Sequence, residues 1–152
     1  MTTRWDIAVY DRNEQLVLVS EIKNKLDAAP EWAGRLRRNI LAHGIYPDAP
    51  FFLIAFPNRF YLWASSKETQ SGINPDYIID ARPILQPYFE KSQITPEQIS
   101  SQSLELIVTA WLSAVIHSER LPEDFSSSEH WLIDSGLYAA IVGGRFEHEV
   151  LA

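Results

Sequence analysis

Apolar and polar residues alternate along two short segments near the start of the chain, residues 5–10 and 15–23. Both segments are rich in Val, Ile and Leu, and four polar residues, 11–14, separate them. Alternation with a period of two on either side of a polar turn predicts a β-hairpin. We expect the rest of the chain to be arranged around this hairpin.

The expected pairing of the hairpin brings two acidic residues onto one face. If the four-residue turn closes symmetrically, Asp6 faces Val19 and lies diagonally across from Glu21. Paired residues point to the same side of a sheet and side chains repeat every second residue, so Asp6, Glu21 and Lys23 share a face, with diagonal neighbours roughly 7–8 Å apart. A divalent ion can bridge carboxylates at that spacing.

Apolar residues are expected on both faces of the second strand. Val17 and Val19 share the face of Glu21, and the opposite face carries Leu16, Leu18 and Ile22. A strand that is apolar on both faces is typical of a covered sheet. Charges at the end of such a strand need a reason, and ligand sites in α/β sheets lie at strand ends.

The hydrophobic pattern also predicts the later elements. Pro87 is expected to break one helical turn, because proline removes a backbone donor. Thr95 precedes a proline and suits the N-cap of the clearest helix of the chain, which is expected from about 95 to 116. The last helix, at 129–142, is expected to end at Gly143 and Gly144. The predicted ranges are a helix at 31–43, strands at 50–56, 59–64 and 77–80, a helical turn at 84–89, a helix from about 95 to 116 and a helix at 129–142.

Apolar residues recur every 3.6 residues along the predicted helix at about 95–116 and form a stripe on one side of it. We interpret it as part of the core or as a contact between subunits, not as a ligand site. Its members are Leu104, Ile107, Val108, Trp111, Leu112, Val115 and Ile116.

Basic residues gather on and just before the first predicted helix. Arg35 and Arg38 project from the same side of this helix, with Arg37 apart from them, and Lys25 precedes the helix. Two interpretations stay open. Lys25, Arg35 and Arg38 contact the phosphates of a nucleic acid, or they form a solvated surface.

Composition narrows the class of protein. The 152 residues are 46% hydrophobic and 22% charged, which is typical of one soluble globular domain. The absence of cysteine excludes disulfides and thiolate metal sites. The apolar run at 51–56 is too short to span a membrane, and the N-terminus does not resemble a signal peptide, so a cytoplasmic location is expected.

The charge is divided unequally along the chain. The net charge is −7, which argues against non-specific wrapping of nucleic acid. Residues 1–63 carry eight basic and seven acidic residues, whereas residues 64–152 carry five and thirteen. A polyanion is therefore expected to meet the N-terminal half.

The hairpin resembles a known motif. An Asp followed by a hydrophobic strand that ends in Glu-x-Lys is similar to the PD-(D/E)xK nuclease superfamily, which has the restriction-endonuclease-like fold; the matching residues are Asp6, Glu21 and Lys23. Strand, strand, helix, strand, strand is also the order of that superfamily after its first helix and strand. The resemblance covers roughly residues 4–64.

The resemblance implies a metal-dependent phosphodiesterase. Asp6 and Glu21 would bind Mg²⁺, or Mn²⁺ in its place, together with the backbone carbonyl of Ile22, and Lys23 would position or help to deprotonate the attacking water. Mg²⁺ prefers hard oxygen ligands and usually takes one or two carboxylates beside substrate phosphate and water. The implied fold is an α/β domain with a mixed central sheet of about four to five strands flanked by helices, in which 1–64 form the nuclease-like core and 65–152 a mainly helical extension.

The chain departs from the family pattern at its N-terminus. The family core begins with a helix, which in many members adds a further acidic residue, and with a strand before the Asp, whereas only five residues precede Asp6 here. The chain is a shortened version, or a later helix or a second subunit covers the exposed side of the sheet. Because uncovered sheet faces and edges aggregate, we expect a homo-oligomer.

Two functions follow. The first is a Mg²⁺-dependent nuclease that cleaves DNA or RNA. The second is an inactive module of the same fold that assembles through the apolar stripe of the long helix. The four histidines at 43, 117, 130 and 148 lack the spacing of a metal site and are expected at helix ends or on the surface.

Overall fold

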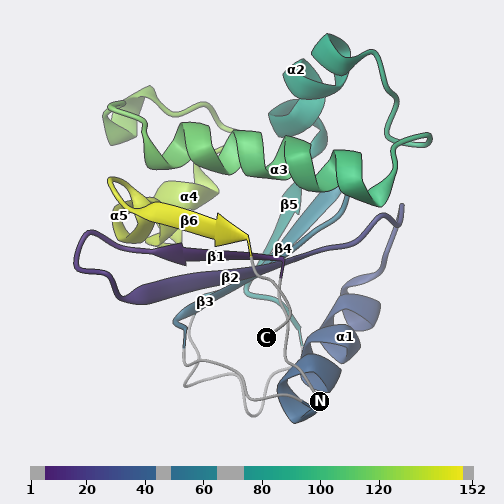
Figure 1. The fold of residues 1–152 in the computed structure, drawn as a ribbon, viewed down its shortest axis with the longest axis horizontal. Coiled ribbons are helices and arrows are strands. Elements are labelled where there is room, and N and C mark those ends of the chain that lie inside the picture. Colours follow the sequence, from purple (N-terminus) through teal and green to yellow (C-terminus); the bar gives the residue numbers. More distant parts are fainter. Residues whose placement is uncertain (1–5, 44–48, 65–73, 149–152) are drawn as a thin grey trace.

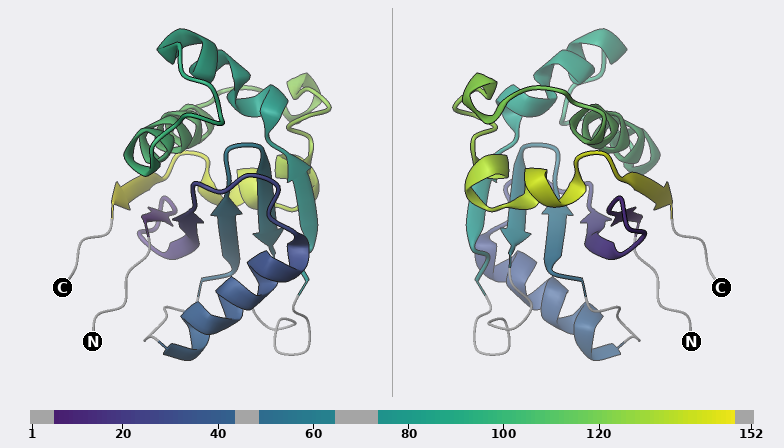
Figure 2. Two further views of the ribbon diagram at one scale, coloured as in Figure 1. Left: turned by 90° about the vertical axis from the view of Figure 1, so that its right-hand side faces the viewer. Right: turned by 90° about the vertical axis from the view of Figure 1, so that its left-hand side faces the viewer.

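The computed structural model describes residues 6–43, 49–64 and 74–148, which form a central sheet with helices on both sides (Figures 1 and 2). The strands are β1 (Ile7–Tyr10), β2 (Leu16–Ile22), β3 (Phe51–Ala55), β4 (Arg59–Trp63), β5 (Tyr77–Asp80) and β6 (Arg145–His148). The α-helices are α1 (Pro30–His43), α2 (Arg82–Ser92), α3 (Ser101–Ile116), α4 (Trp131–Asp134) and α5 (Leu137–Ile141).

The sheet is mixed, with the strand order β5-β4-β3-β2-β1-β6. Strands β2 and β3 are parallel and the other neighbours are antiparallel. A parallel pair needs a crossover connection, and α1 supplies it. The predicted α/β architecture is therefore confirmed, with six described strands instead of four to five. Helix α1 and strands β3 to β5 lie within one residue of their predicted ends.

Two apolar layers hold the helices on the sheet. Helix α1 packs Trp32, Leu36 and Ile40 against a cluster that includes Phe52 and Trp63. The larger core lies on the other face, beneath α2 to α5. Both faces are thus covered by helices of this chain, so a second copy is not needed for that purpose, and the homo-oligomer stays a prediction.

The hairpin pairs in a register that differs from the symmetric one. Ile7 lies opposite Ser20, but Tyr10 lies opposite Leu16, so β2 contains one extra residue, Val17. An extra residue of this kind is a β-bulge, which twists and bends its strand.

The turn of the hairpin is more compact than the predicted one. The carboxylate of Asp11 accepts hydrogen bonds from the backbone N–H groups of Asn13 and Gln15, at 2.8 and 3.0 Å. Glu14 takes the left-handed conformation, with a φ of 64°. Side-chain bonding of this type lets Asp close a short turn. The bulge at Val17 accommodates the one residue by which β2 then exceeds β1.

The bulge changes which residues share a face. Val17 joins Leu18 in the larger core, and Leu16 packs on the side of α1, so the predicted faces of Val17 and Leu16 are wrong. Beyond the bulge the pairing is shifted by two residues from the prediction. Because side chains alternate with a period of two, an even shift leaves Asp6 and Glu21 on one face.

Helix α2 runs through Pro87 and is not the broken turn that was predicted. Proline removes one backbone hydrogen bond from a helix. Three apolar side chains of α2, Ile84, Leu85 and Phe89, are buried in the larger core. Their burial keeps the helix intact on both sides of the proline.

Helix α3 begins at Ser101 and not near Thr95. The Oγ of Ser100 accepts a hydrogen bond from the backbone N–H of Ser103 at 3.1 Å, so Ser100 is the N-cap. Thr95 instead opens a turn, in which its carbonyl accepts from the N–H of Gln98. All seven residues of the predicted apolar stripe are buried in the core.

The predicted last helix is interrupted at Gly136. This glycine has a φ of 85°, which ends α4 and starts α5 in a new direction. Beyond Gly144 the chain forms β6, a strand that the hydrophobic pattern did not predict. The part of the chain after residue 64 thus contributes two strands to the sheet in addition to helices.

Strand β6 pairs with β1 at the edge of the sheet, with His148 opposite Ile7. Its first residue, Arg145, donates a hydrogen bond of 2.7 Å to Glu14 in the hairpin turn, and its guanidinium lies 4.5 Å from the centre of the Tyr10 ring. The hydrogen bond and charge of Arg145 lower the pKa of the Glu14 carboxyl below its ordinary value. These contacts attach the end of the described chain to the hairpin.

We predict that Gly144→Ala detaches β6. A Cβ at this position would lie 2.1 Å from the backbone oxygen of Tyr10, which no side-chain movement can relieve. We expect the free energy of unfolding to fall by about 2–3 kcal/mol, measured by urea denaturation. Glu119→Ala, an exposed change away from β6, should cost less than about 0.5 kcal/mol. Equal stabilities of the two variants would contradict this account of β6.

Candidate functional site

Asp6 and Glu21 lie side by side where β1 begins and β2 ends. The backbone N–H of Asp6 donates to the carbonyl of Ser20 at 3.0 Å, which extends the hairpin pairing by one residue. In return, the backbone N–H of Ile22 donates to the Oδ2 of Asp6 at 2.7 Å. The Asp6 carboxylate is therefore oriented by the last residue of β2, and Asp6 faces Glu21 more directly than the predicted diagonal.

Lys23 completes the group that was predicted from the sequence. Its Nζ lies 3.9 Å from the Oε1 of Glu21. The Glu21 side chain is only 8% exposed, whereas the Lys23 side chain is 41% exposed. The acid is thus held inside the fold, and the ammonium group reaches from it towards solvent.

A polar cavity of about 440 Å³ opens at this place. It lies between the end of β2 and the first turns of α3. The predicted residues Asp6, Glu21, Ile22 and Lys23 all line it, and they are joined by Asn24, Ser101, Gln102 and Glu105. The candidate site therefore also includes Asn24, which the sequence did not single out, and three residues of α3.

Glu105 is the acidic residue that sequence reasoning missed. It is the only charged residue of α3, and an acid in an otherwise uncharged helix was the available signal. The Nδ1 of His148 in β6 lies 3.0 Å from the Oε2 of Glu105. The C-terminal strand thus contacts an acid that lines the cavity.

The donor set suits a hard cation held by few protein ligands. Among residues 6–43, 49–64 and 74–148, no group of three or more His, Cys, Asp or Glu side chains converges closely enough to hold a metal ion. Asp6 and Glu21 are a pair, and Glu105 lines the same cavity without joining them as a third close ligand. Two carboxylates with water and substrate oxygens match the usual ligands of Mg²⁺.

The basic residues proposed as nucleic-acid contacts do not line this cavity. Arg35 and Arg38 are exposed on α1, and the Nζ of Lys25 lies 5.2 Å from the centre of the Trp32 ring. Arg37 is buried, with its guanidinium 5.1 Å from the centre of the Trp63 ring. The predicted separation of Arg37 from its two neighbours is confirmed, and phosphate binding by the exposed residues stays a prediction.

The apolar stripe of α3 cannot serve as an assembly surface in this structure. Trp111, a member of this stripe, is 2% exposed and packs against Phe60 and Trp131. Replacing it with Asp would unfold the core instead of separating subunits. An assembly function of the chain would have to use other residues.

Comparison with protein-family models, with curated proteins and with solved structures found no match to this chain. None of the helices in the described part of the chain is long and apolar enough to cross a membrane. The function must therefore be argued from the site itself.

We predict that Asp6→Ala and Asp6→Asn differ in their effect on the end of β2. Alanine removes the acceptor of the Ile22 amide, whereas asparagine keeps an oxygen acceptor. Loss of the bond should destabilise the site by about 1–2 kcal/mol and raise hydrogen exchange of the Ile22 amide roughly tenfold. Exchange should change little in Asp6→Asn. If both variants exchange like the wild type, Asp6 does not orient the site as described.

Proposed function

We propose that the chain is a Mg²⁺-dependent phosphodiesterase that cleaves DNA or RNA. The observation that carries the proposal is the buried carboxylate of Glu21, which lies beside Asp6 and Lys23 in a polar cavity at the carboxyl end of β2. Ligand sites in α/β sheets lie at such strand ends.

Asp6 and Glu21 would hold the ion, with the backbone carbonyl of Ile22 as a further oxygen ligand. When bound there, Mg²⁺ would neutralise charge on the scissile phosphate and acidify a water molecule. The Ile22 amide would keep the Asp6 carboxylate in place during this step. The ammonium group of Lys23 would orient the attacking water and stabilise negative charge that develops on the phosphate.

The position of the C-terminal elements supports this proposal. The resemblance to the PD-(D/E)xK superfamily implies a strand and an acid-bearing helix ahead of Asp6. In this chain β6 pairs with β1, and α3 carries Glu105 to the cavity. Elements of both kinds therefore lie beside the hairpin, although they come from the other end of the chain. Glu105 could hold a water molecule of the metal or accept a proton at the cavity wall.

The distribution of charge is compatible with a nucleic-acid substrate that approaches from the side of α1. The exposed arginines 35 and 38 and Lys25 lie on or before this helix. They would bind backbone phosphates away from the cleaved bond, a role that positions a nucleic acid without reading its sequence. The acidic C-terminal half would repel strands that approach from its side.

We predict that the wild-type protein cleaves oligonucleotides only with Mg²⁺ or Mn²⁺. Glu21→Gln and Lys23→Met should each lower the cleavage rate by at least roughly 100-fold, because each removes a charged group from the reacting centre. The assay would use single-stranded and double-stranded DNA and RNA, with circular dichroism to verify that the variants are folded.

Glu119→Gln and Lys91→Met are the matched controls. Both residues are exposed and neither lines the cavity, so both variants should cleave like the wild type. Undiminished cleavage by Glu21→Gln would refute the proposal. So would a wild-type protein that cleaves none of the four substrates with either ion.

A further inference from the structure

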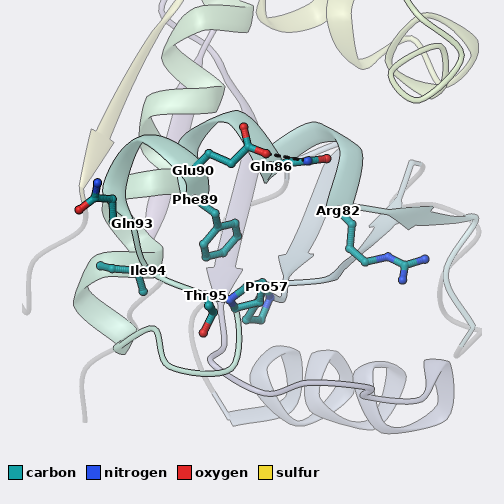
Figure 3. Close-up of a pocket in the computed structure, with 9 residues that line it drawn as sticks. Pro57, Arg82, Gln86, Phe89, Glu90, Gln93, Ile94 and Thr95 are labelled. Carbon is teal, nitrogen blue, oxygen red and sulfur yellow. Dashed lines mark hydrogen bonds between the residues drawn. The ribbon is translucent and has the colours of Figure 1, made fainter.

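A second cavity, of about 540 Å³, lies between α2 and the turn that follows β3 (Figure 3). The walls of its interior are the side chains of Pro57, Phe89, Ile94 and Pro96. Figure 3 shows the Phe89 ring pointing from α2 towards Pro57. Its volume is within the usual range of small-molecule sites, which are mostly apolar with a few polar groups. None of the groups described above as candidate metal or phosphate contacts lies in it.

The two cavities share one segment of chain. Gln93, Ile94, Thr95 and Pro96 line the apolar cavity, and Ser101 and Gln102, a few residues later, line the acidic one. Between them, the carbonyl of Ile99 accepts a hydrogen bond from the side chain of Asn24, which follows β2. The cavities therefore adjoin the ends of the parallel strands β2 and β3.

The charges at the rim of the apolar cavity restrict its ligand. The side chain of Gln86 donates to the Oε2 of Glu90 at 2.7 Å, which holds a carboxylate at the rim. Arg82 makes two hydrogen bonds of 2.9 Å to Asp80, and Figure 3 shows its side chain directed away from the interior. A carboxylate and a neutralised arginine disfavour an anion, so phosphate groups are not expected here.

The remaining groups suit a flat, neutral and polar-edged ring. The edge of the Phe89 ring and the proline rings form apolar walls, and aromatic side chains contact nucleic-acid bases without regard to sequence. The amide of Gln86 and the hydroxyl of Thr95 supply both donors and acceptors. A purely aliphatic chain would offer these polar groups no hydrogen-bond partner.

We infer that the apolar cavity binds a nucleobase of the substrate, next to the phosphodiester bond at the acidic cavity. Because it names a part of the substrate, this inference rests on the proposed function. It also limits the substrate to unpaired nucleotides, because a base inside a duplex must leave the stack to enter a pocket. The cleaved strand is therefore single-stranded at this point, or is opened by the protein.

The test measures base binding without phosphate, metal or cleavage. Each of the four ribonucleosides is titrated into isotope-labelled protein, and the backbone amide signals are followed by NMR. We expect at least one nucleoside to shift the amides of residues 86–96 in a saturable way. Decanoate, an aliphatic anion, is the competing probe. Shifts of these amides by decanoate and by none of the nucleosides would overturn the inference.

Three variants sharpen this titration. Ile94→Trp fills the cavity from a half-buried position and should weaken nucleoside binding at least tenfold. Gln86→Met removes a polar rim group at nearly constant length and should change the preference among the four bases. Lys91→Met, on the same helix but outside the cavity, should bind like the wild type. Unchanged binding by Ile94→Trp would overturn the inference, because the nucleoside would then bind elsewhere.

Failure of this inference and failure of the proposed function give different results. Cleavage that depends on Glu21, without any nucleoside binding at residues 86–96, overturns the base site and leaves the nuclease. Nucleoside binding in a protein that cleaves nothing leaves the base site and overturns the nuclease.

Discussion

The hydrogen bond between the Ile22 amide and the Asp6 carboxylate is the interaction on which the geometry of the candidate site depends. It joins the residue before β1 to the last residue of β2, at a distance of 2.7 Å. The bulge at Val17 sets the register that makes this bond available. A different register would still keep Asp6 and Glu21 on one face if it shifted by an even number, but Asp6 would lose its backbone partner. The site therefore depends on the register of the hairpin as well as on its composition.

Glu21 places a buried carboxylate at the wall of a polar cavity, and this position is why we interpret it as functional. Moving a carboxylate from water into a protein interior costs several kcal/mol. The Nζ of Lys23, 3.9 Å from the Oε1 of Glu21, is one partner of this carboxylate. Cation binding by Glu21 and Asp6 would favour the arrangement directly, and Glu105 would add negative charge to the same cavity.

The hydrophobic pattern predicted the hairpin, α1 and strands β3 to β5 because burial on one or two faces dictates their periodicity. It also predicted that Asp6, Glu21 and Lys23 share a site, since an even register shift leaves the faces unchanged. The bulge and the break at Gly136 could not be predicted, because each depends on the backbone conformation of a few residues. Strand β6 and the contribution of Glu105 were missed because both result from pairing and packing between distant parts of the chain.

Calorimetric titration of Mn²⁺ into the wild-type protein and into Glu21→Gln tests the central claim most directly. Mn²⁺ is preferable to Mg²⁺ here, because a Mg²⁺ site of this kind takes several of its ligands from the substrate and water. The account predicts one ion per chain in the wild type and at least roughly tenfold weaker binding in the variant. Glu119→Gln, an exposed acid removed from the surface, should bind like the wild type. Absence of binding in the wild type, or equal binding in the wild type and Glu21→Gln, would contradict it.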